Sequence, residues 1–179
     1  MSTVLLGQNA VGKSNLLEAI VIIFRDLDLD ERTFFNYSIE YECKKNLLKV
    51  DGGPNVKSKY IFYKGEKSDN LINYTTLVSK AVVKRNKSEY LPKYVFSYYS
   101  GISNRLLEHF DRHQTRFYKA LLDGVDAPPR PLFYARQIHS YFVLMAFYAF
   151  SDQKVSAFLK EFLGIIGLES VLFVLKEPV

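Results

Sequence analysis

The residues best suited to chemistry stand together near the start of the chain, in the stretch GQNAVGKS from Gly7 to Ser14. Its spacing matches the pattern G-x-x-x-x-G-K-[ST] in full. Glycines let a loop backbone approach a phosphate, so that loop N–H groups and the N-terminus of the next helix converge on it. In such a loop Lys13 contacts the β- and γ-phosphate oxygens and the Ser14 hydroxyl ligates Mg²⁺. The pattern predicts a nucleotide site formed by Gly7, Gln8, Asn9, Ala10, Val11, Gly12, Lys13, Ser14 and Asn15.

The flanking residues supply the elements that this loop needs. Val4-Leu5-Leu6 before it is typical of a buried strand. After it, apolar residues recur at helical spacing in two rows, which predicts a helix covered over most of its circumference. The rows are Leu16, Ile20, Ile23 and Leu27, and Leu17, Val21 and Phe24. The alternative is a glycine turn that only caps a helix, and the strand-loop-helix order argues against it.

The class of nucleotide-binding protein can be narrowed from other motifs. A small GTPase needs a D-x-x-G loop, and no aspartate here has glycine three positions later. Its base-reading N-K-x-D motif is also missing, since the nearest match, Asn86-Lys87-Ser88, is followed by Glu89. A small P-loop kinase stays open as an alternative and would alternate strands and helices around a parallel sheet.

The segment after the helix indicates an antiparallel sheet instead. Residues 37–43, YSIEYEC, alternate apolar and polar side chains, as a half-buried strand does. Leu48 and Val50 precede the turn Asp51-Gly52-Gly53-Pro54, and a further strand follows at residues 60–63. Strands joined by short turns form a meander. This arrangement disfavours the small kinase.

The stretch GQNAVGKSNLLEAI resembles the ABC-type ATPase heads of the RecF and structural-maintenance-of-chromosomes class. The later stretches LPKYVFSYYSGISNRLLEHF and RPLFYARQIHSYFVLMAFYAF are similar to AAA-family ATPases associated with bacterial restriction and phage-defence systems. The resemblance implies ATP and Mg²⁺ as ligands, a role in DNA maintenance or phage defence, and a second ATPase head or complementing chain as a partner. It also implies a glutamine after the core strand at residues 94–99, where this chain offers only Ser100.

We therefore expect a mixed α/β, or α+β, fold: a partial P-loop NTPase core with an antiparallel β lobe and a helical lobe. One domain would span residues 1–179. Its parts would be a strand, loop and helix (1–29), the β lobe (33–68), a connector and core strand (69–100), the helical lobe (101–168) and a terminal strand (169–179). In the helical lobe, three apolar faces are expected to form core. They are Leu106, Phe110, Phe117 and Leu121, then Ile138, Tyr141, Phe142, Met145, Ala146 and Ala149, and then Val155, Phe158, Leu159 and Phe162.

The catalytic acids of the resembled class are hard to find here. The last apolar run, residues 171–175, ends in Lys176-Glu177 where an Asp-Glu pair is needed, so Glu177 is the remaining candidate for a catalytic base. No Leu-Ser-Gly-Gly-like signature follows. These features favour a head lacking its first strands and its catalytic half, which would bind ATP without hydrolysing it efficiently.

Charge and composition give three further expectations. Residues 44–93 hold twelve Lys/Arg against four Asp/Glu, within a chain of net charge +5. This basic segment could bind nucleic acid or form a solvated face. If it binds nucleic acid, the chain could alternatively be a nucleic-acid-binding remnant without nucleotide chemistry. No apolar stretch is long enough to span a membrane, and a lone cysteine, Cys43, fits a structural thiol in a cytoplasmic protein. His109 and His113, at i and i+4, lack the zincin glutamate and fit a polar helix face better than a metal site.

Overall fold

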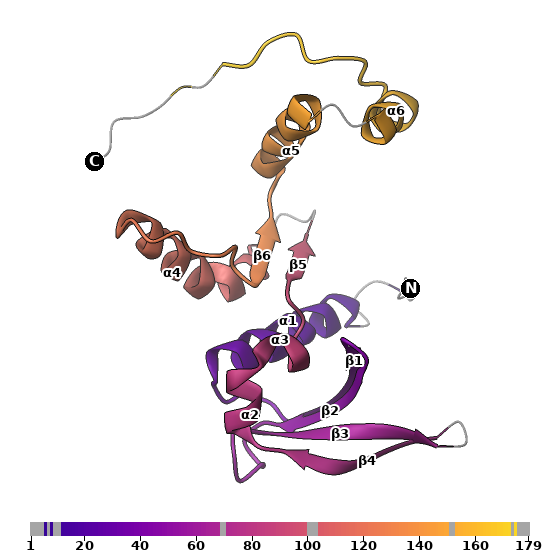
Figure 1. The fold of residues 1–179 in the computed structure, drawn as a ribbon, viewed down its shortest axis with the longest axis vertical. Helices are drawn as coiled ribbons and strands as arrows, with labels where there is room; N and C mark the ends of the chain where they lie inside the picture. The colour runs from indigo at the N-terminus through magenta and orange to yellow at the C-terminus, as the bar shows by residue number, and fades with distance from the viewer. Residues whose placement is uncertain are drawn as a thin grey trace. The chain divides into compact units, whose positions relative to one another are not determined.

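The computed structural model describes Leu6, Gln8 and residues 12–68, 71–99, 104–150, 153–172 and 174. The chain forms two compact units, Met1–Tyr134 and Ala135–Val179. The first unit contains helix α1, an antiparallel sheet and a pair of further strands (Figure 1). The expected mixed α/β fold with an antiparallel sheet is confirmed.

Helix α1 (Lys13–Leu29) follows the glycine-rich stretch, as its apolar spacing predicts. It ends at Asp30, whose left-handed backbone (φ 56°) closes the last turn. Its second half is covered, with Val21, Ile22, Ile23 and Leu27 all buried. Its first turns are not, since Leu16 and Leu17 are about half exposed. The expectation of a helix covered over most of its circumference therefore fails at the loop end.

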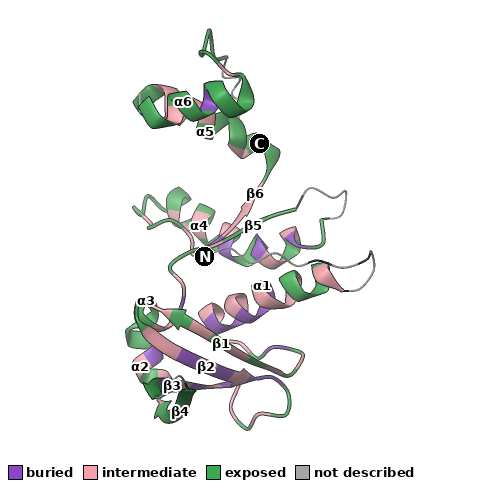
Figure 2. Cartoon of the chain, turned by 90° about the vertical axis from the view of Figure 1, so that its right-hand side faces the viewer, coloured by how far each residue is buried: buried purple, intermediate pink, exposed green. Residues whose placement is uncertain are grey.

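Four strands form the antiparallel sheet in the order β1-β2-β3-β4. They are β1 (Tyr37–Cys43), β2 (Asn46–Gly52), β3 (Tyr60–Ser68) and β4 (Leu71–Val78). Val50 of the central strand β2 lies opposite Ile39 and Phe62. It is fully buried in a core shared with Ile23 and Leu27 of α1, so this sheet packs against the helix (Figure 2). Strand β4 was not expected, because the segment from residue 69 was interpreted as a connector.

The chain then returns to the other side of α1 through short elements. These are α2 (Lys80–Arg85), α3 (Lys87–Tyr90), β5 (Val95–Tyr98), the 3₁₀ turn η1 (Leu107–Phe110), α4 (Asp111–Leu122) and β6 (Leu132–Ala135). Strands β5 and β6 pair, and their arrows point the same way in Figure 1. Val21 of α1, Phe110 and Leu132 form a second buried cluster. Helix α1 therefore has the antiparallel sheet on one side and the β5/β6 pair on the other.

The expected face of the first lobe helix is only partly correct. Leu106 and Phe110 are buried, but Leu121 is about half exposed. The chain runs there as η1 and then α4, and the buried residue of α4 is His113. A polar side chain therefore takes a core position that the apolar spacing did not mark.

The second unit contains helices α5 (Gln137–Phe150) and α6 (Gln153–Leu163). The expectation that their apolar faces form core is wrong in most positions: α5 has no buried residue, and Leu159 is the buried residue of α6. Phe158 and Phe162 of α6 stack on each other with ring centroids 5.2 Å apart, yet both stay at least half exposed. Little in the described chain covers the predicted apolar faces of these two helices.

The terminal strand expected within residues 169–179 is absent from the described part of that segment. Residues 164–172 and 174 have no regular structure, and Leu172 is 88% exposed. A strand requires a neighbour that pairs with its backbone, and the strands of the two described sheets pair elsewhere. Among the described residues, no helix is both long and apolar enough to cross a membrane.

Candidate nucleotide site

The described part of the glycine-rich loop ends in a backbone that favours glycine. Gly12 precedes α1 with φ 85° and ψ 10°, in the left-handed region. Residues with a Cβ adopt this region at a cost, whereas glycine does not. A Cβ on Gly12 would meet no atom of the described residues within 4 Å, so backbone conformation is the reason for glycine that the described chain shows. The Gly12 carbonyl accepts the first helical hydrogen bond, from Leu16 N at 3.0 Å.

The two residues with predicted chemical roles begin the helix. Lys13 is its first residue, and its Nζ donates to the carbonyl oxygen of Gln8 at 2.5 Å, so the lysine side chain turns back over the loop. Ser14 and Asn15 follow in the first turn and are exposed, as is Gln8. Outside the described residues lie Gly7, Asn9, Ala10 and Val11. Of the strand predicted at Val4-Leu5-Leu6, only Leu6 is described.

The start of α1 is electrically suited to an anion. The N-terminus of a helix carries partial positive charge and N–H groups without helical partners. Within the described chain, no side chain caps this end, and the first turn contains no acidic residue. Lys13 adds a full positive charge. The helix start can therefore receive an anionic group without displacing a carboxylate.

A cavity of about 290 Å³ begins at Ser14 and lies between α1 and β5. Its lining includes Ser14, Leu17 and Glu18 of the helix, and Ser97 and Tyr99 at the end of β5. In α/β proteins, ligands bind beyond the carboxyl ends of parallel strands. The cavity therefore connects the serine of the loop motif with the end of a core strand, where the ligands of such folds are found. Ser100, the one polar residue expected there, lies outside the described residues.

Four side chains connect this helix to η1 and the residues just before it. Glu18 forms an ion pair with Arg105 and accepts a hydrogen bond from His109 Nε2, whose nitrogen lies 2.9 Å from Oε1. On the other side of the ring, His109 Nδ1 lies 2.8 Å from an Nη of Arg25. A guanidinium can only donate, so Nδ1 accepts and Nε2 carries the proton. His109 therefore links two charged residues of α1 that lie two turns apart.

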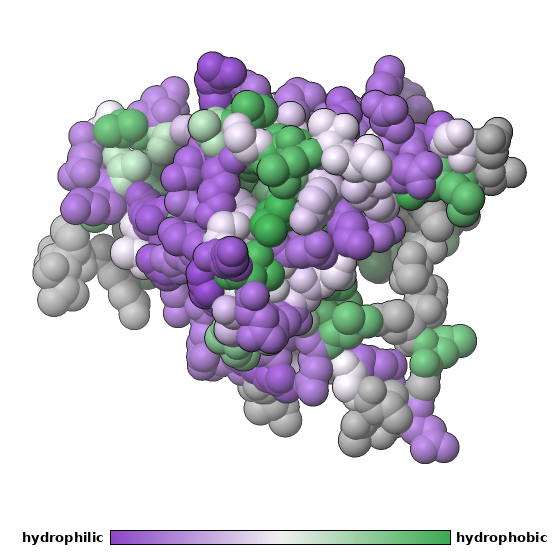
Figure 3. Space-filling view, turned by 90° about the horizontal axis from the view of Figure 1, so that it is seen from below, coloured by the Kyte–Doolittle hydropathy of each residue, from purple (hydrophilic) through white to green (hydrophobic). Residues whose placement is uncertain are grey.

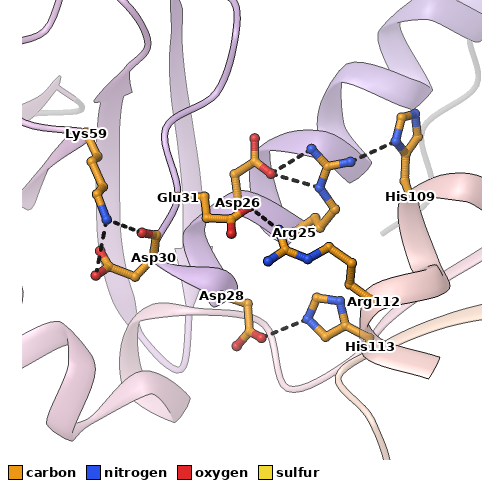
Figure 4. A network of polar contacts seen from close by, with 9 residues as sticks. All are labelled: Arg25, Asp26, Asp28, Asp30, Glu31, Lys59, His109, Arg112 and His113. Carbon is orange, nitrogen blue, oxygen red and sulfur yellow. Dashed lines mark hydrogen bonds and ion pairs between the residues drawn. The ribbon is translucent and has the colours of Figure 1, made fainter. Parts of the chain in front are cut away.

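The end of α1 is held by a second set of polar contacts (Figure 4). Asp28 accepts from His113 Nε2 at 2.9 Å and from Lys87 Nζ at 3.1 Å. Burial alone raises the pKa of Asp28, but these two hydrogen bonds outweigh burial and lower it. Glu31 pairs with Arg112, which lowers the pKa of that carboxyl too. The acidic end of the helix is thus neutralised by α3 and α4.

These contacts give both histidines partners within the described chain. His109 and His113 bond to different carboxylates, and among the described residues no three His, Cys, Asp or Glu side chains gather as a metal site. This network was not predictable from the sequence. The sequence does show acidic residues on α1 and His and Arg residues within 105–113. Local spacing does not indicate which of these acidic and basic side chains form pairs.

The remaining sequence candidates have simpler outcomes. Cys43 is half-buried on β1, its thiol donates to the carbonyl of Leu91 at 3.4 Å, and burial raises the pKa of the thiol. This environment fits a structural thiol, because only the thiolate is a strong nucleophile. Glu177 lies outside the described residues.

Comparison with known proteins adds the family. No curated protein and no solved structure matches the chain. A protein family described as "AAA domain, putative AbiEii toxin, Type IV TA system" matches residues 2–150, which include the glycine-rich loop, the antiparallel sheet and the β5/β6 pair. The chain therefore belongs to this AAA-domain family, whose members have a P-loop NTPase fold and an ATPase-like, nucleotide-binding type of domain.

Proposed function

We propose that this chain binds Mg²⁺-ATP through the loop from Gly7 to Asn15. The observation that carries the proposal is the start of α1: a left-handed Gly12, then Lys13 and Ser14 in a first turn without a carboxylate, beside a cavity that reaches the end of β5. Lys13 would leave the Gln8 carbonyl to contact the β- and γ-phosphate oxygens. Ser14 would be the protein ligand of Mg²⁺.

The surroundings of the loop favour an ABC-type head of the RecF or structural-maintenance-of-chromosomes kind within the family. After the loop helix, an antiparallel sheet follows directly and packs on that helix, and only then does the chain reach the β5/β6 pair. A small kinase instead places further parallel strands and helices there. The order of elements thus supports the ATPase head over the kinase.

Efficient hydrolysis is not part of the proposal. Phosphoryl transfer needs an acid to hold Mg²⁺ and a group to orient the attacking water. Strands β5 (VFSY) and β6 (LFYA) contain no Asp or Glu, so neither supplies such an acid from within the strand. We infer that the chain binds ATP and turns it over slowly by itself, and that a second ATPase head or complementing chain would supply the missing groups.

The biological role follows only from the family description. That description names an AbiEii toxin and a type IV toxin–antitoxin system, which accords with the resemblance to phage-defence ATPases. We propose a role in phage defence for this chain, with DNA maintenance as the alternative. The basic segment 44–93 remains a candidate nucleic-acid surface.

Two measurements test the proposed site. Titration of the chain with a fluorescent ATP analogue should show binding that strengthens with Mg²⁺, and Ser14→Ala should remove most of that Mg²⁺ effect while retaining metal-free binding. Steady-state phosphate release should be far below one turnover per second, since loss of one trans-acting element costs a factor of about 10³ to 10⁵. Mg²⁺-independent binding in the parent chain would contradict the proposed role of Ser14.

A further inference from the structure

A second cavity, of about 240 Å³, lies in the first unit at the far end of α1 from the loop. We call it the His113 cavity. Its polar lining consists of Asp28 of α1, His113 and Arg116 of α4, and Arg130 of the connection to β6. Apolar side chains complete it, among them Phe117 and Pro128. None of these residues belongs to the proposed ATP site.

Two buried nitrogens of this lining have no hydrogen-bond partner among the described residues. They are Nδ1 of His113 and an Nη of Arg130. The His113 side chain is only 4% exposed. Buried polar groups almost always have a partner, and an exception in a folded protein needs an explanation such as a missing ligand. Two exceptions that line the same cavity point to one ligand that satisfies both.

The lining groups specify the chemistry of that ligand. Arg116 and Arg130 form no ion pair in the described chain, while Asp28, the one carboxylate of the lining, is already ion-paired with Lys87 and hydrogen-bonded to His113. Arg130 also lies over the Phe133 ring, 4.8 Å from its centroid, which holds the guanidinium in place. Two arginines together are well suited to the oxygens of a phosphate group, which they can bind through several parallel N–H bonds.

The position of the proton on the His113 ring narrows the class of anion that fits the cavity. Its Nε2 faces the ionised Asp28 and must therefore donate, so in the neutral ring Nδ1 is an acceptor. A phosphomonoester monoanion has anionic oxygens for the arginines and one P–OH that can donate to Nδ1. A sulfate ester has the anionic oxygens but no O–H. We propose that the His113 cavity binds the phosphoryl group of a small phosphomonoester whose apolar part contacts Phe117 and Pro128.

Hydrogen bonds to neighbouring elements hold two walls of the His113 cavity in place, as a binding site requires. The carbonyl of Pro131 accepts from Val95 N of β5 at 2.7 Å, and this anchors the segment that carries Arg130. The His113–Asp28 contact anchors the other wall to α1. The cavity volume suits a small molecule, so the proposal is a small ester.

Calorimetric titration with phenyl phosphate near pH 6, about the second pKa of a phosphate ester, tests this site, because about half of the ester is then the monoanion. The full chain with Lys13→Ala is used, so that the ATP loop contributes little. We expect one binding site per chain, at least about tenfold weaker binding in a further Arg130→Gln variant, and at least about tenfold weaker binding of phenyl sulfate. Arg112→Gln is the matched control, because Arg112 lies one turn before Arg116 but does not line the cavity.

A spectroscopic readout separates binding from structural loss. The ¹⁵N resonance of His113 Nδ1, assigned with His113→Gln, should shift when phenyl phosphate is added and should not shift with phenyl sulfate. The absence of phenyl phosphate binding would overturn the proposal. So would equal weakening by Arg112→Gln and Arg130→Gln, because it would show a general charge effect. Failure of the ATP site would leave these outcomes unchanged, since Lys13 is replaced throughout.

Discussion

The carboxylate of Asp30 lies 2.7 Å from Nζ of Lys84, and it also accepts a hydrogen bond from the hydroxyl of Tyr60 at 2.8 Å. Asp30 closes α1, while Lys84 lies on α2 and Tyr60 on β3. The hydrogen bond from Lys84, helped by those from Tyr60 and the charge of Lys59, lowers the pKa of Asp30 to about 2 from 3.8. One residue thus links the end of the loop helix to two other elements.

This shift predicts how stability depends on pH. The folded state holds the ionised Asp30 more strongly than the unfolded chain does, so the contribution is present above about pH 4 and is lost as the pH falls toward about 2. Asp30→Asn should therefore flatten the dependence of the free energy of unfolding on pH in that window. Urea unfolding between about pH 2 and pH 6 measures it, with Asp126→Asn, an exposed position, as the control. An unchanged slope in Asp30→Asn would contradict the assignment.

Replacing His109 should destabilise the first unit. His109→Leu leaves Arg25 and Glu18 without their shared partner in a half-buried place, and such a loss costs about 1–3 kcal/mol. His109→Gln can still donate to Glu18 and should cost less. Chemical denaturation of both variants measures the difference. Equal stability of His109→Leu and the parent chain would show that this network does not hold η1 on α1.

Two glycines with positive φ should respond differently to alanine. Gly12 has open space around a Cβ, so Gly12→Ala should cost only the left-handed conformation, about 1–2 kcal/mol. A Cβ on Gly53 (φ 121°) would overlap the backbone oxygen of Phe35, which adds about 1–3 kcal/mol. Thermal unfolding should therefore rank Gly53→Ala as the less stable variant. The opposite order would mean that the loop before α1 is more tightly packed than the described residues indicate.

The basic segment is partly occupied with internal contacts. Five of its lysines form ion pairs, namely Lys44, Lys49, Lys59, Lys84 and Lys87. The surface seen in Figure 3 is largely hydrophilic with apolar side chains among the polar ones, and so does not by itself mark a nucleic-acid surface. Seven basic residues of the segment lack an ion pair within the described chain: Lys45, Lys57, Lys64, Lys67, Lys80, Arg85 and Lys93.

If nucleic acid binds here, it must use these remaining charges. Reversing Lys57, Lys64 and Lys67 to Glu should then abolish retention of DNA or RNA and reduce the salt dependence of binding, because fewer counterions are released. Lys59 is left unchanged, since its loss would also disturb Asp30. Filter binding at several salt concentrations measures this. Full retention by the triple variant would leave only a solvated lysine face.

The sequence predicted those elements whose signal is local. Helix α1 was predictable from apolar residues at helical spacing after a glycine-rich loop, and β1 from strict alternation. Strand β4, LINYTTLV, was missed because adjacent apolar pairs at both ends break that alternation. Helix α5 shows the other limit: periodicity identifies an apolar face, but whether anything covers that face depends on contacts far away in the sequence.

The same limit applies to the sites. Lys13 and Ser14 were predictable because the phosphate loop is a short, continuous motif. His109 contacts Arg25 and Glu18, which precede it in the sequence by 84 and 91 positions. No local sequence pattern encodes such a pairing. The His113 cavity was hidden for that reason too, since Asp28, Arg116 and Arg130 meet only in the folded chain.

The most direct test of the account is ATP binding by the purified chain and by Lys13→Ala, measured by calorimetry with Mg²⁺ present. Lys13→Ala removes a charge-assisted contact to phosphate worth about 1.5–3 kcal/mol, so ATP affinity should fall about tenfold or more. Lys45→Ala, an exposed lysine away from the loop, should bind as the parent chain does. Equal ATP affinity in the parent chain and Lys13→Ala would contradict the proposal that this loop holds the nucleotide.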